Sequence, residues 1–107
     1  MSTHSEQITA EVATWPGIET VQAGSHITYR LGRREIGHLH GDHAAHFGFP
    51  KAVWAELHEQ GRIGYHPVFP EKPGPAARRI ADEDDVRDVF ALLRLNYDRM
   101  MASRVPA

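Results

Sequence analysis

The sequence predicts an α+β fold: a small antiparallel β-sheet of five to six strands accompanied by three helices. Strand-like stretches of alternating apolar and polar residues are separated by turns of two or three residues, which are too short for the crossovers that join parallel strands. Segments with helical apolar spacing lie only at the beginning, the middle and the end of the chain. No G-x-G-x-x-G stretch lies between a strand and a helix, which disfavours a dinucleotide-binding parallel sheet.

The first predicted element is a short helix. Thr3 and Glu6 have the spacing of a capping box, in which the hydroxyl and the carboxylate satisfy free backbone N–H groups. Ile8 and Val12 lie four residues apart and therefore on one helical face. Pro16 ends the helix because it has no backbone N–H and its ring clashes with the preceding turn.

Four strand-like segments follow the helix. They cover residues 18–22, 26–31, 34–40 and 43–49. Gly32 and Arg33 form a two-residue hairpin turn between the second and third segments. In residues 34–40 the two-residue period places Ile36, His38 and His40 on one face. The other face is predicted to carry Glu35, Gly37 and Leu39.

The second half of the chain is predicted to contain two helices and two further strands. Pro50 begins a middle helix, and Gly61 lies where a helix C-terminus needs a left-handed residue. Residues 62–69 resemble a strand interrupted at Pro67, and residues 70–75 form a proline-rich loop. Residues 76–80 are predicted to be a last short strand. A long C-terminal helix, capped by Asp82, follows it with a regular apolar stripe.

Length and composition indicate one globular domain spanning 1–107, with an ordered core of about 3–102. The chain has no cysteine, which excludes disulfides, thiolate metal sites and thiol catalysis within it. A net charge of −2 gives no strong field toward nucleic acid. No apolar run reaches the roughly 20 residues of a membrane span, and residues 1–7 lack an apolar signal region, so a cytoplasmic location without membrane contact is expected.

Histidine is the unusual residue type. Four of the eight histidines lie between positions 38 and 46. The string from His38 to His43 spells H-x-H-x-D-H, which is similar to the zinc loop of metallo-β-lactamase-fold hydrolases. That fold is about twice as long and takes further ligands far downstream, and here two of the histidines lie in a strand pattern. We therefore disfavour the hydrolase interpretation.

A smaller site is compatible with the chain length. His38 and His40 lie two residues apart in a strand and point to the same face, so they could bind one metal ion together. Asp42, His43, His46 or His66 could supply a third ligand. A structural alternative stays open. In it, the alternating histidines are simply polar residues on the solvent-exposed face of a sheet. Metal binding would require neutral imidazoles and would weaken below about pH 6.5.

Several strings carry a resemblance to a known family. They are the run from Gly32 to Asp42, Phe49-Pro50, His66-Pro67 and the run from Leu92 to Tyr97. Over about residues 15–100 the chain resembles small bacterial proteins grouped as the luciferase family or luciferase domain, whose biochemical function is unknown. The order of elements is also similar to double-wing domains of the MmcQ/YjbR type, a fold analogy. By position, the resemblance implicates His38, His40, Gly41, Asp42 and His66.

These observations lead to two hypotheses of different classes. The first is a protein with a histidine-lined ligand pocket beside the third strand, for a small molecule or a divalent metal ion. Its predicted ligand-binding residues are His38, His40, Asp42 and His66. Its predicted metal ligands are His38, His40, His43 and His46. The alternative is a non-enzymatic interaction module, forming a homodimer through an exposed sheet face. Nucleic-acid binding has only the double-wing analogy in its favour, and the acidic balance opposes it.

Overall fold

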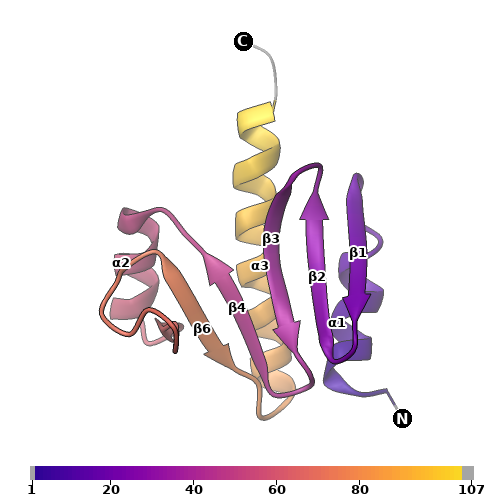
Figure 1. Cartoon of the computed structure of the whole chain (residues 1–107), viewed down its shortest axis with the longest axis horizontal. Coiled ribbons are helices and arrows are strands. Elements are labelled where there is room, and N and C mark those ends of the chain that lie inside the picture. Colours follow the sequence, from indigo (N-terminus) through magenta and orange to yellow (C-terminus); the bar gives the residue numbers. More distant parts are fainter. Residues whose placement is uncertain (1, 105–107) are drawn as a thin grey trace.

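Six antiparallel strands and three helices make up the computed structural model, which describes residues 2–104 (Figure 1). The elements in chain order are α1 (His4–Val12), β1 (Ile18–Ala23), β2 (His26–Leu31), β3 (Arg34–His40), β4 (Ala44–Gly48), α2 (Lys51–Glu59), β5 (Gly64–Tyr65), β6 (Pro75–Arg79) and α3 (Glu83–Arg104). The strands are arranged in the order β1-β2-β3-β4-β6-β5. The predicted α+β class, the strand number and the three helix positions are confirmed.

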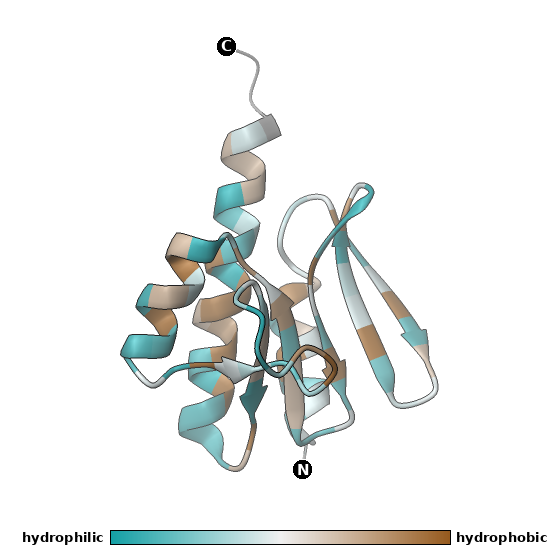
Figure 2. Ribbon diagram, turned by 60° about the vertical axis from the view of Figure 1, so that its left-hand side comes forward, coloured by the Kyte–Doolittle hydropathy of each residue, from teal (hydrophilic) through white to brown (hydrophobic). Residues whose placement is uncertain are grey.

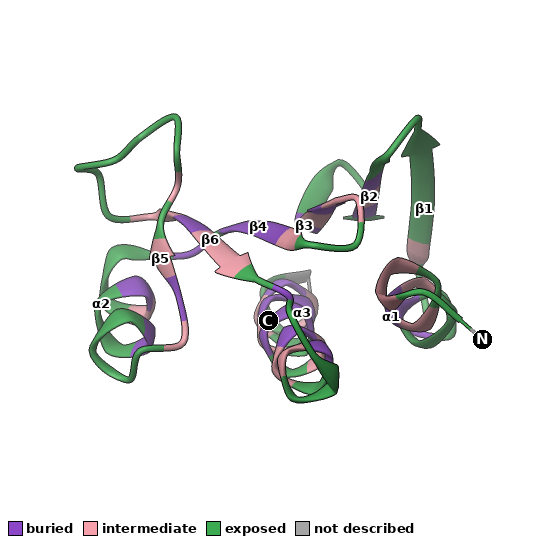
Figure 3. Ribbon diagram, turned by 90° about the horizontal axis from the view of Figure 1, so that it is seen from below, coloured by how far each residue is buried: buried purple, intermediate pink, exposed green. Residues whose placement is uncertain are grey.

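All three helices lie on one face of the sheet, and the other face is open (Figure 3). The core between the sheet and the helices includes apolar residues of every helix and of β2, β3, β4 and β6. Apolar and polar bands alternate along α3 (Figure 2), because one stripe of the helix faces the core. The buried residues of that stripe include Val86, Val89, Leu93, Tyr97 and Met100.

The predicted helix ends are confirmed. The Glu6 backbone N–H donates to the Thr3 hydroxyl at 3.1 Å, and the Thr3 N–H donates to the Glu6 carboxylate at 2.8 Å. The backbone N–H of Asp85 donates to Oδ1 of Asp82 at 2.9 Å at the start of α3. Gly61 follows α2 with a φ of 74°, a conformation that glycine adopts without a steric penalty.

The β2–β3 hairpin contains a bulge that the sequence pattern did not predict. Tyr29 pairs with Gly37, but the next residue, Arg30, pairs with Glu35. Ile36 is therefore an extra residue of β3 without a partner on β2. An extra residue in one strand shifts its alternation by one position, so residues on either side of a bulge exchange faces.

The predicted assignment of faces in β3 is wrong on the N-terminal side of this bulge. Simple alternation placed Ile36 with the histidines and Glu35 on the opposite face. Ile36 is instead completely buried in the core. Glu35 lies on the histidine side, with Oε2 at 2.8 Å from Nδ1 of His38. His38 and His40 follow the bulge, and both are half-buried.

The second half of the sheet is less regular than the first. The predicted strand at 62–69 is shortened to β5, followed by a turn and an isolated bridge between His66 and Phe69. Pro67 explains the shortening because it has no N–H for a ladder hydrogen bond. The strand predicted at 76–80 is β6, and it pairs with both β4 and β5.

Asn96 of α3 connects the two halves of the sheet. Beyond their pairing region, β3 and β4 diverge over α3 (Figure 1). The Asn96 side chain is completely buried there, and its Nδ2 donates to the carbonyl oxygens of Ile36 at 3.1 Å and Gly48 at 3.0 Å. These bonds satisfy two carbonyls that the diverging strands leave without ladder partners.

Candidate metal centre

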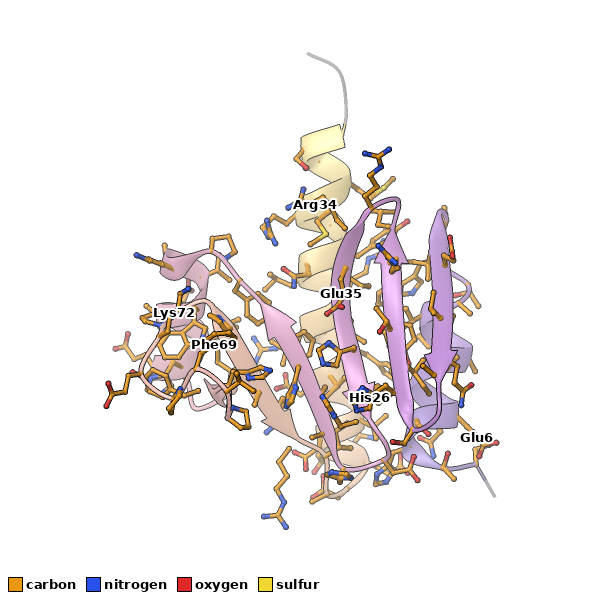
Figure 4. The ribbon with its side chains drawn as sticks, in the orientation of Figure 1. Glu6, His26, Arg34, Glu35, Phe69 and Lys72 are labelled. Atoms are coloured by element: carbon orange, nitrogen blue, oxygen red, sulfur yellow. The ribbon has the colours of Figure 1, made fainter. Side chains whose placement is uncertain are left out.

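The sheet register brings four histidines together on the open face. His38 on β3 is the partner of His46 on β4. His40 on β3 is the partner of His26 on β2. Directly paired residues on antiparallel strands share a face, and so do residues two apart in one strand. All four side chains therefore project away from the helices; Figure 4 shows the labelled His26 on this face together with Glu35.

Three of these histidines form a compact group of nitrogen donors, His38, His40 and His46. One ring nitrogen from each lies within 4.8 Å of the others. Nε2 of His38 and Nε2 of His40 are 3.1 Å apart. Two imidazole ligands of a tetrahedral zinc ion, with Zn–N distances near 2.1 Å, would be separated by about 3.4 Å. One pair is close to this spacing, and His46 offers a ring nitrogen within 4.8 Å of the other two.

The Glu35 carboxylate determines which nitrogen of His38 is free. Oε2 of Glu35 lies 2.8 Å from Nδ1 of His38. An ionised carboxylate only accepts hydrogen bonds, so Nδ1 of His38 carries a proton and donates it. The lone pair of the neutral ring is then on Nε2, the atom that faces His40. A carboxylate behind the outer nitrogen of a histidine is the usual support of a metal ligand.

His46 is the most buried histidine of the group. Its exposed fraction is 9%, and its Nδ1 has no hydrogen-bond partner within residues 2–104. Buried polar atoms in proteins are nearly always paired, so an unpaired Nδ1 makes His46 an unusual histidine. Burial first, and then the neighbouring His40, His66, His38 and His26, lower the pKa of His46 to about 4.

The pKa of His40 is shifted in the same direction as that of His46. Burial, followed by the neighbouring histidines, lowers the pKa of His40 below its ordinary value. The causes differ in kind, since burial disfavours any charge and each neighbour disfavours a second positive charge beside its own. Both side chains are consequently neutral at pH 7, which is the form of imidazole that binds metal ions.

The comparison with family models agrees with the resemblance found in the sequence. Residues 33–96, more than half of the chain, match the family described as Luciferase domain. The chain belongs to the luciferase domain family. The matched part of this luciferase domain contains the three grouped histidines, Glu35 and His66, while His26 lies outside it. No match to the chain was found among curated proteins or among solved structures.

His66 of the luciferase domain lies beside the group but outside it. Its ring centroid is 4.2 Å from that of His46. The backbone N–H of Val68 donates to Nδ1 of His66 at 3.1 Å. Nδ1 is therefore an acceptor, and the neutral ring carries its proton on Nε2. In this form Nε2 of His66 is a hydrogen-bond donor.

Two residues predicted from the sequence are not brought to the group. Oδ1 of Asp42 accepts a hydrogen bond from the backbone N–H of Ser5 at 3.0 Å in the first turn of α1. Hydrogen bonding by the Ser5 side chain, and then by its backbone, lowers the pKa of Asp42. Asp42 lines a separate cleft with residues at the N-terminus of α1. His43 is exposed in the turn between β3 and β4. Neither belongs to the group of three nitrogen donors.

Two site residues were missed by sequence reasoning, His26 and Glu35. His26 had no usable signal, because the two-residue turn after residue 31 would by itself pair His26 with Leu39, and only the bulge at Ile36 shifts its partner to His40. Glu35 had no usable signal either, because simple alternation places it on the face opposite the histidines and only the bulge corrects this.

In the described part of the chain, no helix has the length and apolar character that crossing a membrane requires.

Proposed function

We propose that this luciferase-domain protein binds one divalent transition-metal ion, zinc by its donor set, through His38, His40 and His46. The observation that carries the proposal is the group of three histidines, one of which has a buried ring nitrogen without a partner and another of which is oriented by Glu35. Imidazole is a good ligand for zinc, copper, nickel and iron, and all-oxygen ions such as magnesium are disfavoured.

The number of ligands indicates what kind of site this would be. Structural zinc sites are closed by four protein ligands, whereas catalytic sites use three and leave one position open. The group offers three, and the face on which it lies is open to solvent (Figure 3). A metal ion there would polarise a bound ligand or lower the pKa of a bound water. The proposal is thus an open site that accepts a small molecule.

The structural interpretation of the histidines is the competing explanation. It accounts for the pair of Nε2 atoms, since one imidazole can donate a hydrogen bond to the other. It does not account for His46, whose buried Nδ1 has no partner in the described part of the chain. An unpaired buried nitrogen costs about 1–3 kcal/mol, and a metal ligand bond or a reorganised ring removes that cost.

Metal titration of the tagless protein tests the proposal. We expect one equivalent of cobalt(II) to bind and to produce the visible absorption bands of a metal site of low symmetry. Zinc should then displace the cobalt. His46→Ala and His38→Ala should each weaken cobalt binding by more than about 100-fold, beyond the effect of losing an outer-shell partner.

His43→Ala is the matched control, because His43 was a predicted ligand but is exposed outside the group. It should leave cobalt affinity unchanged. A wild-type protein that binds neither cobalt nor zinc would refute the proposal. Equal losses from His43→Ala and His46→Ala would refute the assignment of ligands.

A further inference from the structure

We infer that the open position of this metal site takes a small monocarboxylate with an apolar body. One carboxylate oxygen would bind the metal, the other would accept a hydrogen bond from Nε2 of His66, and the body would lie against Val68 and Phe69. This inference rests on the proposed function, and it names the class of ligand. Four features of the structure support it: the proton on His66, an apolar loop, a floor of small residues and the local charge.

The first feature is a hydrogen-bond donor beside the three ligands. The Val68 N–H group occupies Nδ1 of His66, so the neutral ring offers only an N–H at Nε2. The His66 ring lies 4.2 Å from the His46 ring, centroid to centroid. A donor next to a metal ion selects a ligand with a second acceptor atom close to its metal-binding atom. The two oxygens of a carboxylate meet this requirement.

The second feature is an apolar surface that continues from this donor. The loop between β5 and β6 rises from the open face of the sheet (Figure 3), and its apolar segment is visible in Figure 2. Val68 is 70% exposed and Phe69 is 45% exposed. The Phe69 ring lies 5.8 Å from the His66 ring, and the Phe69 N–H donates to the His66 carbonyl at 2.9 Å, which fixes the turn. Exposed apolar side chains beside a polar site are typical of ligand contacts.

The third feature is a set of small residues beside the histidines on β4, β6 and β5. The register continues the row of His46 to Ala77 and then to Gly64. It continues the row of His40 to Ala44. Paired residues share a face, so these positions carry nothing larger than a methyl group toward the open side. A ligand body can therefore lie along the row that runs from His46 over Ala77 to Gly64.

The fourth feature is charge. Neutral imidazoles leave the charge of a divalent ion uncompensated, apart from the single charge of Glu35 behind His38. Arg79 is the partner of Ala44 and lies in the same row on the open face. Nζ of Lys72 lies 5.6 Å from the centre of the Phe69 ring; Figure 4 labels both residues on the loop. The surroundings therefore favour an anionic head group.

The experiment uses cobalt-loaded protein and three probes: hexanoate, acetate and 1-hexanol. Binding is followed by the visible spectrum of cobalt and by calorimetry. Hexanoate should change the cobalt spectrum and bind about 10-fold more tightly than acetate, because partial burial of its extra methylenes contributes to affinity. Hexanol, which lacks the anionic head group, should bind at least 10-fold more weakly than hexanoate.

Variants separate the two contacts. His66→Phe keeps an aromatic ring and removes the donor, so it should weaken both carboxylates about 10-fold and leave cobalt affinity unchanged. Phe69→Ser should weaken hexanoate and leave acetate unchanged. Val21→Ser is the matched control, because Val21 is 40% exposed on the edge strand β1, away from the loop; it should change neither affinity.

The possible failures are distinguishable. Protein that binds no cobalt refutes the proposed function itself. Protein that binds cobalt but shows equal affinity for the three probes refutes only the ligand class. If His66→Phe weakens cobalt binding as strongly as His46→Ala does, His66 is a metal ligand and its role as a donor is wrong.

Discussion

Glu35 illustrates how a single exposed side chain can matter for the site without contributing much to folding. Its carboxylate forms an ion pair or charged hydrogen bond with His38, but the two side chains are 42% and 25% exposed. Pairs this accessible contribute about 0–1 kcal/mol to stability because water screens them. The importance of Glu35 lies in orientation, since it keeps the proton on Nδ1 of His38 and the lone pair on Nε2.

We predict that Glu35→Gln weakens cobalt binding by about 10-fold and changes the free energy of unfolding by less than about 1 kcal/mol. The amide retains the size of the side chain but accepts the His38 proton less strongly than a carboxylate does. Cobalt titration and urea unfolding measure the two effects. Glu19→Gln, on the exposed edge strand β1, should change neither. Full cobalt affinity in Glu35→Gln would show that the carboxylate does not orient His38.

At the scale of elements, the contact between β3 and α3 determines where the two histidines of β3 lie. Gly37 pairs next to the bulge and faces the long helix. A Cβ atom on Gly37 would lie 2.7 Å from Cδ2 of Leu93 and 3.1 Å from Cδ1 of Phe47. The strand can approach α3 this closely only because the position has no side chain.

We therefore predict that Gly37→Ala destabilises the protein by about 1–3 kcal/mol, the usual cost of overpacking a core. The matched control is Gly48→Ala at the end of β4, where a Cβ would have no atom within 4 Å. Its backbone is not in the left-handed region, so this control should be neutral or slightly stabilising. Urea unfolding of both variants is the measurement. Similar stabilities of the two would show that α3 adjusts to the added methyl group.

The elements also show how far the sequence could be interpreted. Alternation within residues 26–31 and the two-residue turn after them are local signals, and they predicted β2 and the turn of the β2–β3 hairpin correctly. The bulge at Ile36 is not local, because it depends on how β3 packs against α3 and how Asn96 holds Ile36 and Gly48. The pairing of β6 with both β4 and β5 likewise depends on contacts distant in sequence.

For the whole molecule, the three grouped histidines lie within nine residues of the chain, but His26 and His66 beside them come from distant segments. The same-face relation of His38 and His40 was predictable from their spacing, and His46 was included among the candidate ligands. His66 lies beside them only because β6 brings β5 and the following turn toward β4. Asp42 and His43 are close in sequence to the group, yet the turn that contains them lies at the sheet margin. Proximity in sequence was therefore only a partial guide to proximity in the site.

Bringing neutral histidines together also makes the stability of the whole fold depend on pH. His46 has a pKa of about 4 in the folded protein and an ordinary value near 6.5 when unfolded. Between these two values the unfolded chain binds a proton at His46 that the folded protein does not bind. The free energy of unfolding therefore decreases as the pH falls through this window, and the stability gained by the neutral form is present above it.

We predict that the metal-free protein loses roughly 2 kcal/mol of stability between pH 7 and pH 5 through His46 alone. His40 contributes in the same direction, because burial and its neighbours lower its pKa too. Urea unfolding in the presence of a chelator, at several pH values above the range of most carboxylates, measures the slope. His46→Phe should flatten it, whereas His58→Gln on the exposed side of α2 should not. Added zinc should raise stability more at pH 7 than at pH 5, since protons compete for the same nitrogens. A slope that is identical in His46→Phe and in the wild type would show that His46 is not held neutral by the fold.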